Sequence, residues 1–333
     1  FTVSAVAGVP MPERTMVTIT PAEGTEAKVD FGKIEYTEND IDKTYTYTVK
    51  EVAGNQEGIT YDDKFHTVTV KIADNGDGTL KVEAAYADGD KVILTNIYNA
   101  DGELTLDVEK TMKGRSFMEG DVFTFTVEAA EGVPMPEMAE VVIEPTSGTN
   151  AKVDFGKIAY SLEDAGKTYV YTVKETAGSI SGVTYDQNAY TVTVQVADNG
   201  LGGLTVTPVY ADGSRVTFVN TYGATGTYQL TATKELIGKK LTDGQFTFVL
   251  KNEQGKELAT ATNTADGQIT FKAFNFSQSD IGKTYTYYVS ERMEELEGYT
   301  YDTTVFEVKL TVSDNGDGTL TVTASGLPEG GMK

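Results

Sequence analysis

The sequence predicts an all-β protein made of tandem immunoglobulin-like β-sandwich domains. Three observations support this fold class: short segments that alternate apolar and polar residues, clusters of Gly, Asn and Asp between them, and one unit that repeats at domain-length intervals. The 333 residues include 19 Tyr, 14 Phe and 34 Gly, a composition that favours strands joined by tight turns. No long stretch has the period of a helix.

Three copies of one unit follow one another along the chain. "AKVDFGKI" occurs at residues 27–34 and again at 151–158. "ADNGDGTL" at 73–80 returns as "ADNGLGGL" at 197–204, and a third copy, "SDNGDGTL", begins 116 residues later. Repetition at this length indicates separate domains of one kind.

We expect one β-sandwich repeat in each of the ranges 1–99, 100–223 and 224–333. Phe1 aligns with Phe125, so the first repeat should lack its first strand. The third should lack its last strand, because the sequence stops before a match to "VTFVNTY". With no N-terminal Met, signal peptide or sorting tail, we expect an internal segment of a longer protein. Either the parent continues with further repeats, or a neighbouring chain supplies the absent strand.

The middle repeat shows seven or eight short alternating segments that we expect to be strands. They lie near residues 103–110, 121–129, 138–143, 151–155, 167–174, 189–196, 203–209 and 215–220. This number and spacing are typical of a sandwich of immunoglobulin-like size.

One strand of each repeat ends its apolar face in a carboxylate. In "KTYTYTVKE" every second residue from Tyr45 to Val49 shares one face, and the next residue on that face is Glu51. Glu175 and Glu291 occupy the same place in the other two repeats.

A lysine and an asparagine follow the same pattern on two other strands. "LTLDVEK" places Lys110 on an inward apolar face, as "LTATK" does Lys234. "VTFVN" ends its inward face with Asn220, and the first repeat has Asn96 there. An isolated charge in a core costs many kcal/mol unless it is neutralised or paired. Any one of these residues is explained by a strand end that snorkels to the rim of the core. Three types at matching positions indicate a shared chemical purpose.

Burial predicts the chemistry of this trio. It lowers the pKa of a lysine and raises that of a glutamate, which gives a nucleophilic amine and a protonated acid. We expect the acid to polarise the asparagine carbonyl while the amine attacks its Cγ atom. Loss of ammonia would leave an amide between the two side chains, and the fold would supply the high effective molarity that the reaction needs.

The ordered motifs "LTLDVEK", "YTVKE" and "VTFVNTY" resemble the isopeptide-linkage (CnaB-like) domains of Gram-positive pilins, in the streptococcal major-pilin or T-antigen-like family. The resemblance extends over all three repeats. It implies that Lys110 is the nucleophile, Asn220 the acceptor and Glu175 the catalytic acid.

The same resemblance gives incomplete trios in the other two repeats. The first keeps Glu51 and Asn96 but lacks the lysine strand. The third keeps Lys234 and Glu291, and its asparagine would fall near position 336. We therefore expect a single intramolecular bond in this chain.

Composition and resemblance together limit the partners and the location. The net charge of −23 argues against nucleic acid and anionic membranes, and no apolar run is long enough for a membrane span. Without cysteine, disulfides and thiolate metal sites are excluded. The resemblance implies an extracellular, cell-surface protein that needs no cofactor or metal. Its partners would be neighbouring repeats or subunits of the same surface fibre, while a host ligand stays open.

The "DNGDG" turns invite a calcium interpretation. An EF-hand alignment on Gly78 places Ala73 and Ala84 where ligands are required, so a β-hairpin turn explains the motif better. His66 is the only histidine, which excludes a Ser/His/Asp set repeated along the chain. We do not expect an enzyme that acts on external substrates.

The main alternative is a plain immunoglobulin-like adhesin module that binds a host or partner molecule through its loops and forms no cross-link. A stalk requires Lys110, Glu175 and Asn220 to converge in the core, whereas an adhesin requires a ligand-binding loop patch. The loops are short, polar and similar between repeats, which favours the stalk.

Overall fold

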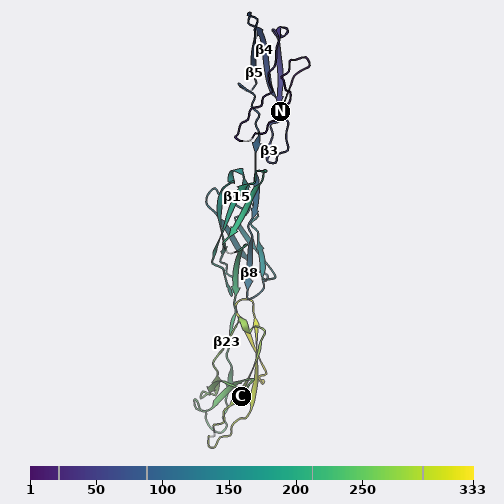
Figure 1. Cartoon of the computed structure of the whole chain (residues 1–333). Coiled ribbons are helices and arrows are strands. Elements are labelled where there is room, and N and C mark those ends of the chain that lie inside the picture. Colours follow the sequence, from purple (N-terminus) through teal and green to yellow (C-terminus); the bar gives the residue numbers. More distant parts are fainter. Residues whose placement is uncertain (22, 88, 212, 295) are drawn as a thin grey trace.

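Strands make up nearly all the regular secondary structure of this chain. The structure is a computed structural model that describes residues 1–21, 23–87, 89–211, 213–294 and 296–333. Figure 1 shows three β-rich bodies end to end, with the N-terminus in the first and the C-terminus in the last. Within the described residues there is no α-helix, only three 3₁₀ turns: η1 (Glu38–Asp40), η2 (Leu162–Asp164) and η3 (Gln278–Asp280). The predicted all-β fold of tandem sandwiches is confirmed.

The middle repeat has two main sheets. One has the strand order β10-β9-β13-β15-β16, the other β11-β8-β17-β14, and β7 pairs with β12 beside them. Their bounds are β7 (Asp101–Thr105), β8 (Val108–Lys113), β9 (Phe123–Glu128), β10 (Glu140–Ile143), β11 (Asn150–Val153), β12 (Lys157–Ser161), β13 (Thr168–Thr176), β14 (Val183–Thr184), β15 (Ala189–Asp198), β16 (Leu204–Tyr210) and β17 (Val216–Tyr222). Strands β8 and β17 are parallel neighbours, whereas the other pairs are antiparallel.

The first expected strand of this repeat is two strands in the structure. The segment 103–110 is divided between β7, which pairs with β12, and β8, which pairs with β11 and β17. The chain changes partners at Leu106 and Asp107, between the two strands, where Leu106 is still buried. Because Leu106 continues the alternation of buried and exposed residues, the break between β7 and β8 is not visible in the apolar–polar pattern of the sequence.

The first repeat has a four-stranded sheet in the order β1-β2-β4-β5 and a separate pair, β3-β6. Its strands are β1 (Thr2–Ser4), β2 (Thr44–Lys50), β3 (Ile59–Thr60), β4 (His66–Asp74), β5 (Leu80–Tyr86) and β6 (Ile97–Tyr98). The third repeat has a five-stranded sheet, β21-β20-β24-β25-β26, and the pairs β18-β23 and β19-β22. Its strands are β18 (Thr225–Tyr228), β19 (Thr231–Thr233), β20 (Thr247–Asn252), β21 (Glu257–Thr262), β22 (Gln268–Thr270), β23 (Phe274–Ser277), β24 (Thr284–Glu291), β25 (Val305–Asp314) and β26 (Leu320–Ser325).

The hydrophobic core is continuous through the middle and third repeats and separate in the first. In the middle repeat Phe123, Phe125 and Phe218 are at most 1% exposed. Burying a side chain of this size stabilises the fold by about 1.5–3 kcal/mol. The fully buried core of the first repeat is much smaller and includes Tyr47 and Ile72.

A capped turn fixes the start of the strand that carries the glutamate. In the middle repeat the backbone N–H of Ser161 donates to the Asp164 carboxylate at 2.8 Å, and the Tyr169 hydroxyl donates to the same carboxylate at 2.5 Å. The other two repeats have the same turn, with Asp40 and Asp280 as acceptors. Hydrogen bonds between the turn and the beginning of the strand therefore fix which residues of each glutamate-bearing strand face the core.

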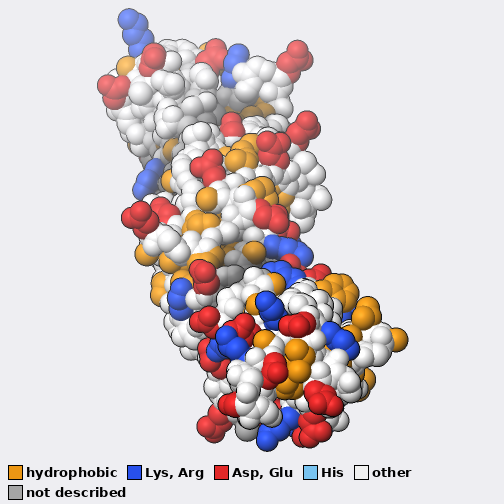
Figure 2. All heavy atoms as spheres, turned by 90° about the horizontal axis from the view of Figure 1, so that it is seen from above, with side chains coloured by type: hydrophobic (Ala, Val, Ile, Leu, Met, Phe, Trp, Pro, Cys, Tyr) orange, Lys and Arg blue, Asp and Glu red, His pale blue; other side chains and the backbone are white. Residues whose placement is uncertain are grey.

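The surface reflects the acidic composition. Acidic side chains are spread along the whole visible length of the molecule rather than gathered in one place (Figure 2). Among the described residues, no helix has the length and hydropathy of a membrane span.

Candidate functional site

Three polar side chains meet inside the middle sandwich. Lys110 lies on β8 directly opposite Phe218 of the parallel strand β17, so Asn220, two residues further on, points to the same face. Glu175 approaches from the other sheet, near the end of β13, where it pairs with Phe125 of β9. The alternation of each strand therefore aims all three side chains into the space between the sheets.

The contacts within this trio are short and dry. Lys110 Nζ donates to Glu175 Oε2 at 2.8 Å, and Asn220 Nδ2 donates to Glu175 Oε1 at 2.8 Å. The side chains of Lys110 and Glu175 and the whole of Asn220 are 0% exposed. One carboxyl group thus lies between the amine and the amide.

Burial controls the ionisation of the pair. It lowers the pKa of Lys110, with the hydrogen bond to Glu175 opposing the shift, and it raises the pKa of Glu175 against the effect of Lys110. The rings of Phe123 and Phe125 lie 5.1 Å and 6.0 Å from Lys110 Nζ. Ring faces attract a charged amine, so it is the exclusion of water from the site that favours the neutral amine and the protonated acid.

Asp186 is a further member of the site. Its backbone N–H donates to Asn220 Oδ1 at 2.8 Å. Its carboxylate accepts from the backbone N–H groups of Val219, 3.0 Å away, and Asn188, 2.9 Å away. Burial acts to raise the pKa of this carboxyl group, but those hydrogen bonds hold it below its usual value. Sequence reasoning missed Asp186, although "TYD" recurs in all three repeats.

The orientation of the amide differs from the expected one. We expected Glu175 to polarise the carbonyl of Asn220, but Glu175 contacts the nitrogen, and the carbonyl oxygen accepts from the Asp186 backbone. The acid therefore faces the leaving group, while a fixed backbone dipole faces the oxygen.

The first repeat brings two of its expected residues together. Asn96 Nδ2 donates to Glu51 Oε1 at 3.0 Å, and the backbone N–H of Asp62 donates to Asn96 Oδ1 at 3.0 Å. Glu51 is buried, and its Oε2 atom has no hydrogen-bond partner among the described residues. The equivalent oxygen of Glu175 is the one that accepts from Lys110.

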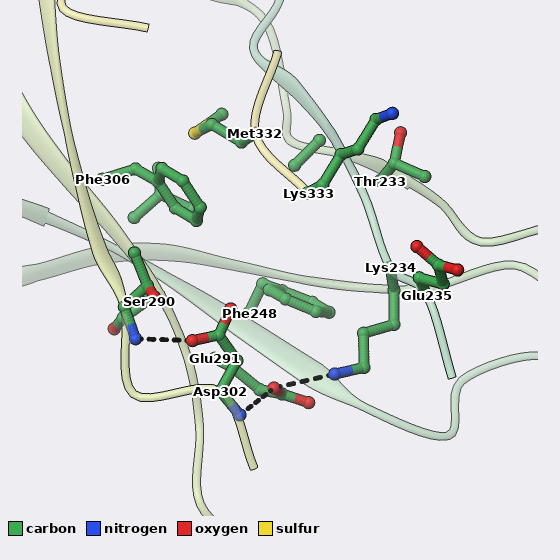
Figure 3. A pocket seen from close by; sticks show the side chains of 13 residues that line it. Thr233, Lys234, Glu235, Phe248, Ser290, Glu291, Asp302, Phe306, Met332 and Lys333 are labelled. Atoms are coloured by element: carbon green, nitrogen blue, oxygen red, sulfur yellow. Dashed lines mark hydrogen bonds and ion pairs between the residues drawn. The ribbon is translucent and has the colours of Figure 1, made fainter. Parts of the chain in front are cut away.

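The third repeat holds the complementary pair. Lys234 Nζ donates to Glu291 Oε2 at 2.9 Å, and the backbone N–H of Asp302 donates to the same oxygen at 3.1 Å. Both side chains border a pocket of about 250 Å³, shown in Figure 3, which Met332 also lines. Glu291 Oε1, the counterpart of the oxygen that contacts Asn220, is buried and has no partner in the described part of the chain.

The "DNGDG" motifs are hairpin turns. In the first repeat Asp74 accepts from the backbone N–H of Gly76 at 2.8 Å, and Asp77 accepts from that of Thr79 at 3.0 Å. Across the described ranges, no group of three or more His, Cys, Asp or Glu side chains is arranged to hold a metal.

Fold and site together define a class: tandem β-sandwich domains with a buried Lys–Glu–Asn trio between the sheets. Comparison with protein families agrees. The family model described as FctA, Spy0128-like isopeptide containing domain, matches residues 1–99, 106–223 and 230–330. The chain belongs to this family, as three consecutive domains.

Solved structures give weaker similarities. The major pilin protein T-13 of Streptococcus pyogenes serotype GAS131465 is 17% identical with a TM-score of 0.30, over 68% of this chain and 97% of that one. Another Streptococcus pyogenes major pilin is 17% identical with a TM-score of 0.27, over 66% and 96%. The Bacillus anthracis TIE protein is 13% identical with a TM-score of 0.27, over 86% and 44%. These scores are too low to support a conclusion. The comparison with curated proteins gave no match.

Proposed function

We propose that this chain is a segment of a structural stalk or pilus shaft on the surface of a Gram-positive bacterium. An isopeptide bond between Lys110 and Asn220 would carry mechanical load through its middle repeat. The observation that carries the proposal is the buried trio, in which Glu175 lies 2.8 Å from both reacting nitrogens. Membership of an isopeptide-domain family supports the same chemistry. The reaction occurs once per chain and uses no external substrate or cofactor.

The geometry assigns a role to each group in the proposed reaction. The neutral Nζ of Lys110 attacks Cγ of Asn220, and the charge that develops on Oδ1 is stabilised by the backbone N–H of Asp186. Protonated Glu175 gives its proton to Nδ2 through Oε1 and takes one from Nζ through Oε2. Nδ2 leaves as ammonia, the C–O double bond re-forms, and Glu175 ends in the protonation state in which it began.

The bond would close a long loop between neighbouring strands. Lys110 and Asn220 enclose about 110 residues, which by the loop-entropy estimate used for disulfides is worth about 4–5 kcal/mol. Strands β8 and β17 run in parallel, so tension entering along β8 would cross at Lys110 and leave through the last residues of β17. Residues 111–219 would then lie outside the load path.

The partners proposed for the chain are neighbouring repeats or subunits of the same cell-surface fibre. The three bodies already lie end to end in one chain (Figure 1), which is the arrangement that a stalk requires. Covalent support of the middle body would stiffen such a fibre without cysteine.

Pulling on single molecules tests this function. We expect the wild-type chain, held at its two ends, to show unfolding steps from the first and third repeats only. In Glu175→Gln the bond does not form, and a third step of about 35–40 nm appears as the middle repeat extends. Glu51→Gln in the first repeat serves as the matched control and leaves the number of steps unchanged. A step from the middle repeat of the wild-type chain would contradict the proposal.

A further inference from the structure

A tyrosine of the first repeat is inserted into a hairpin turn of the second. The Tyr98 hydroxyl donates to Asp198 Oδ1 at 2.7 Å and accepts from the backbone N–H of Gly202 at 3.1 Å. The backbones approach so closely that a Cβ atom on Gly58 would lie 2.5 Å from the Cα of Gly202. The turn that receives the tyrosine is the second "DNG" motif, between β15 and β16.

The second junction repeats the first in every one of these contacts. The Tyr222 hydroxyl donates to Asp314 Oδ1 at 2.7 Å and accepts from the backbone N–H of Gly318 at 3.0 Å. A Cβ atom on Gly182 would lie 2.6 Å from the Cα of Gly318. The same contacts form at both junctions although the sequences around them differ. The junction geometry is therefore a property of the repeated unit.

The residues after each tyrosine complete the junction. The linkers read "YNADG" and "YGATG", a shared Tyr-x-Ala-x-Gly pattern. A Cβ atom on Gly102 would lie 2.9 Å from that of Leu204, and one on Gly226 would lie 2.8 Å from that of Leu320. Only glycine fits at either position, because Leu204 and Leu320 of the receiving repeat pack directly against the backbone there.

The first repeat carries the same turn in the same conformation. Asp74 accepts from Gly76 at 2.8 Å, and the corresponding bonds in the two occupied turns are both 2.9 Å. Gly78, the counterpart of Gly202, has φ +85°, compared with +79° there. In the described structure no atom lies within 4 Å of the place where a Cβ on Gly78 would be. The receiving turn is therefore formed in advance and open.

We propose that the turn from Asp74 to Thr79 is a docking site for a preceding domain of this same kind. That domain would present a Tyr-x-Ala-x-Gly segment, and its tyrosine would bond to the Asp74 carboxylate and the Gly78 N–H group. A phenol donating to an ionised carboxylate makes a charge-assisted hydrogen bond, which is stronger than a neutral one. The inference rests on the proposed stalk and identifies the surface by which the stalk continues.

The third repeat presents the opposite surface. Gly298 corresponds to Gly58 and Gly182 and has φ +86°, and no described atom lies within 4 Å of the position that a Cβ on it would take. The first repeat thus carries the receiving turn of a junction, and the third carries the glycine of the presenting side. An interface of this heterologous kind adds domains head to tail, and the three repeats of this chain lie end to end rather than in a ring (Figure 1).

An extended chain tests the docking site. A second copy of residues 1–124 is fused in front of Phe1, so that the original first repeat gains both its first strand and a preceding Tyr98. We expect amide hydrogen exchange at 74–79 to slow about tenfold relative to the unextended chain. Exchange at 198–203 gives the rate for an occupied turn. Equal exchange at 74–79 in the two chains would overturn the proposal.

Further measurements separate the possible causes. Tyr98→Phe in the added copy alone should restore fast exchange at 74–79, because it removes only the hydroxyl group. If calcium slows the exchange of these amides in the unextended chain, the turn is a metal site and the proposal is wrong. Intact mass reports the cross-link independently, since the original first repeat now has Lys110 of the added copy beside Glu51 and Asn96. Failure of docking and failure of cross-linking are therefore distinguished, and exchange in β4 confirms that the repeat is folded.

Discussion

The middle and first repeats hold the same site in different states of completeness. In the middle repeat Lys110, Glu175 and Asn220 are all buried and in contact. In the first repeat the contact between Glu51 and Asn96 is made, but Asn96 is exposed. The acid–amide half of the site therefore forms without its lysine, and the lysine strand adds the cover that excludes water.

The third repeat shows the converse. Lys234 and Glu291 form their ion pair beside an open pocket, and the lysine side chain is 12% exposed, compared with 0% for Lys110. Each half of the site is thus positioned by its own strands. The difference teaches that the asparagine and the lysine each reach the glutamate of the facing sheet independently of the other. Among the described residues, only the middle repeat brings all three together in a dry core.

The largest expected effect comes from preventing the bond. Glu175→Gln should lower the free energy of unfolding of the middle repeat by about 4–5 kcal/mol, because the loop constraint on the unfolded chain is lost. Denaturant dependence of hydrogen exchange in β8 and β13 measures this directly. The matched change Glu51→Gln should leave exchange in the middle repeat unaltered. An equal free energy of unfolding in wild type and Glu175→Gln would contradict the proposed bond.

The next effect concerns the junction between the middle and third repeats. Gly182→Ala and Gly200→Ala both force alanine into a left-handed backbone, φ +76° and +73°, at a cost of about 1–2 kcal/mol. Only at Gly182 does the new Cβ also meet another repeat. We expect hydrogen exchange at 314–319 to accelerate in Gly182→Ala and to stay unchanged in Gly200→Ala. The same behaviour in both variants would show that the close approach is unimportant.

A smaller effect is expected from the positioning residue. Asp186→Asn keeps one side-chain oxygen as an acceptor but removes the charge that strengthens the hydrogen bonds from Val219 and Asn188. The backbone N–H of residue 186, which donates to the Asn220 carbonyl, is then held less firmly. Loss of a direct oxyanion donor slows a reaction about 100–1,000-fold, so a displaced donor should slow bond formation about tenfold. Intact mass sampled during cell-free synthesis gives the rate. Asp62→Asn in the first repeat is the matched control, and an unchanged rate in Asp186→Asn would exclude the role.

The smallest effect is a pH dependence in a chain that cannot form the bond. In Asn220→Ala, Glu175 keeps a folded-state pKa raised above the ordinary value of 4.5. Above pH 4.5 the Glu175 carboxyl group therefore binds more protons in the folded protein than in the unfolded protein. Its stabilising contribution is therefore complete below that pH and is lost as the pH rises through the folded pKa, with a slope of at most about 1.4 kcal/mol per pH unit. The double variant Asn220→Ala/Glu175→Gln should lack this slope; identical pH profiles would contradict the assignment.

Much of the fold and three of the four residues of the candidate site could be predicted from alternation in the sequence. Glu175, Lys110 and Asn220 were found because each continues an apolar face at a spacing of two, and the structure places all three between the sheets. Alternation did not reveal the break between β7 and β8, because Leu106 stays buried where the strand changes partners.

Two other features are invisible to such patterns for physical reasons. Asp186 contacts the asparagine through its backbone N–H, a group that every residue except proline carries, so residue type does not signal it. The junction tyrosines contact turns about a hundred residues away in another repeat, as Tyr98 does with Asp198. The sequence identified the "DNG" motifs as turns. That two of them contact the tyrosine of the preceding repeat depends on how successive domains stack, which the sequence pattern does not show.

The intact mass of the purified chain, followed by peptide mapping, tests the central claim most directly. The account predicts a mass lower than that of the sequence by one ammonia, with the peptides that contain Lys110 and Asn220 joined. A full, unmodified mass would contradict it and leave the buried trio as a hydrogen-bonded cluster without a bond.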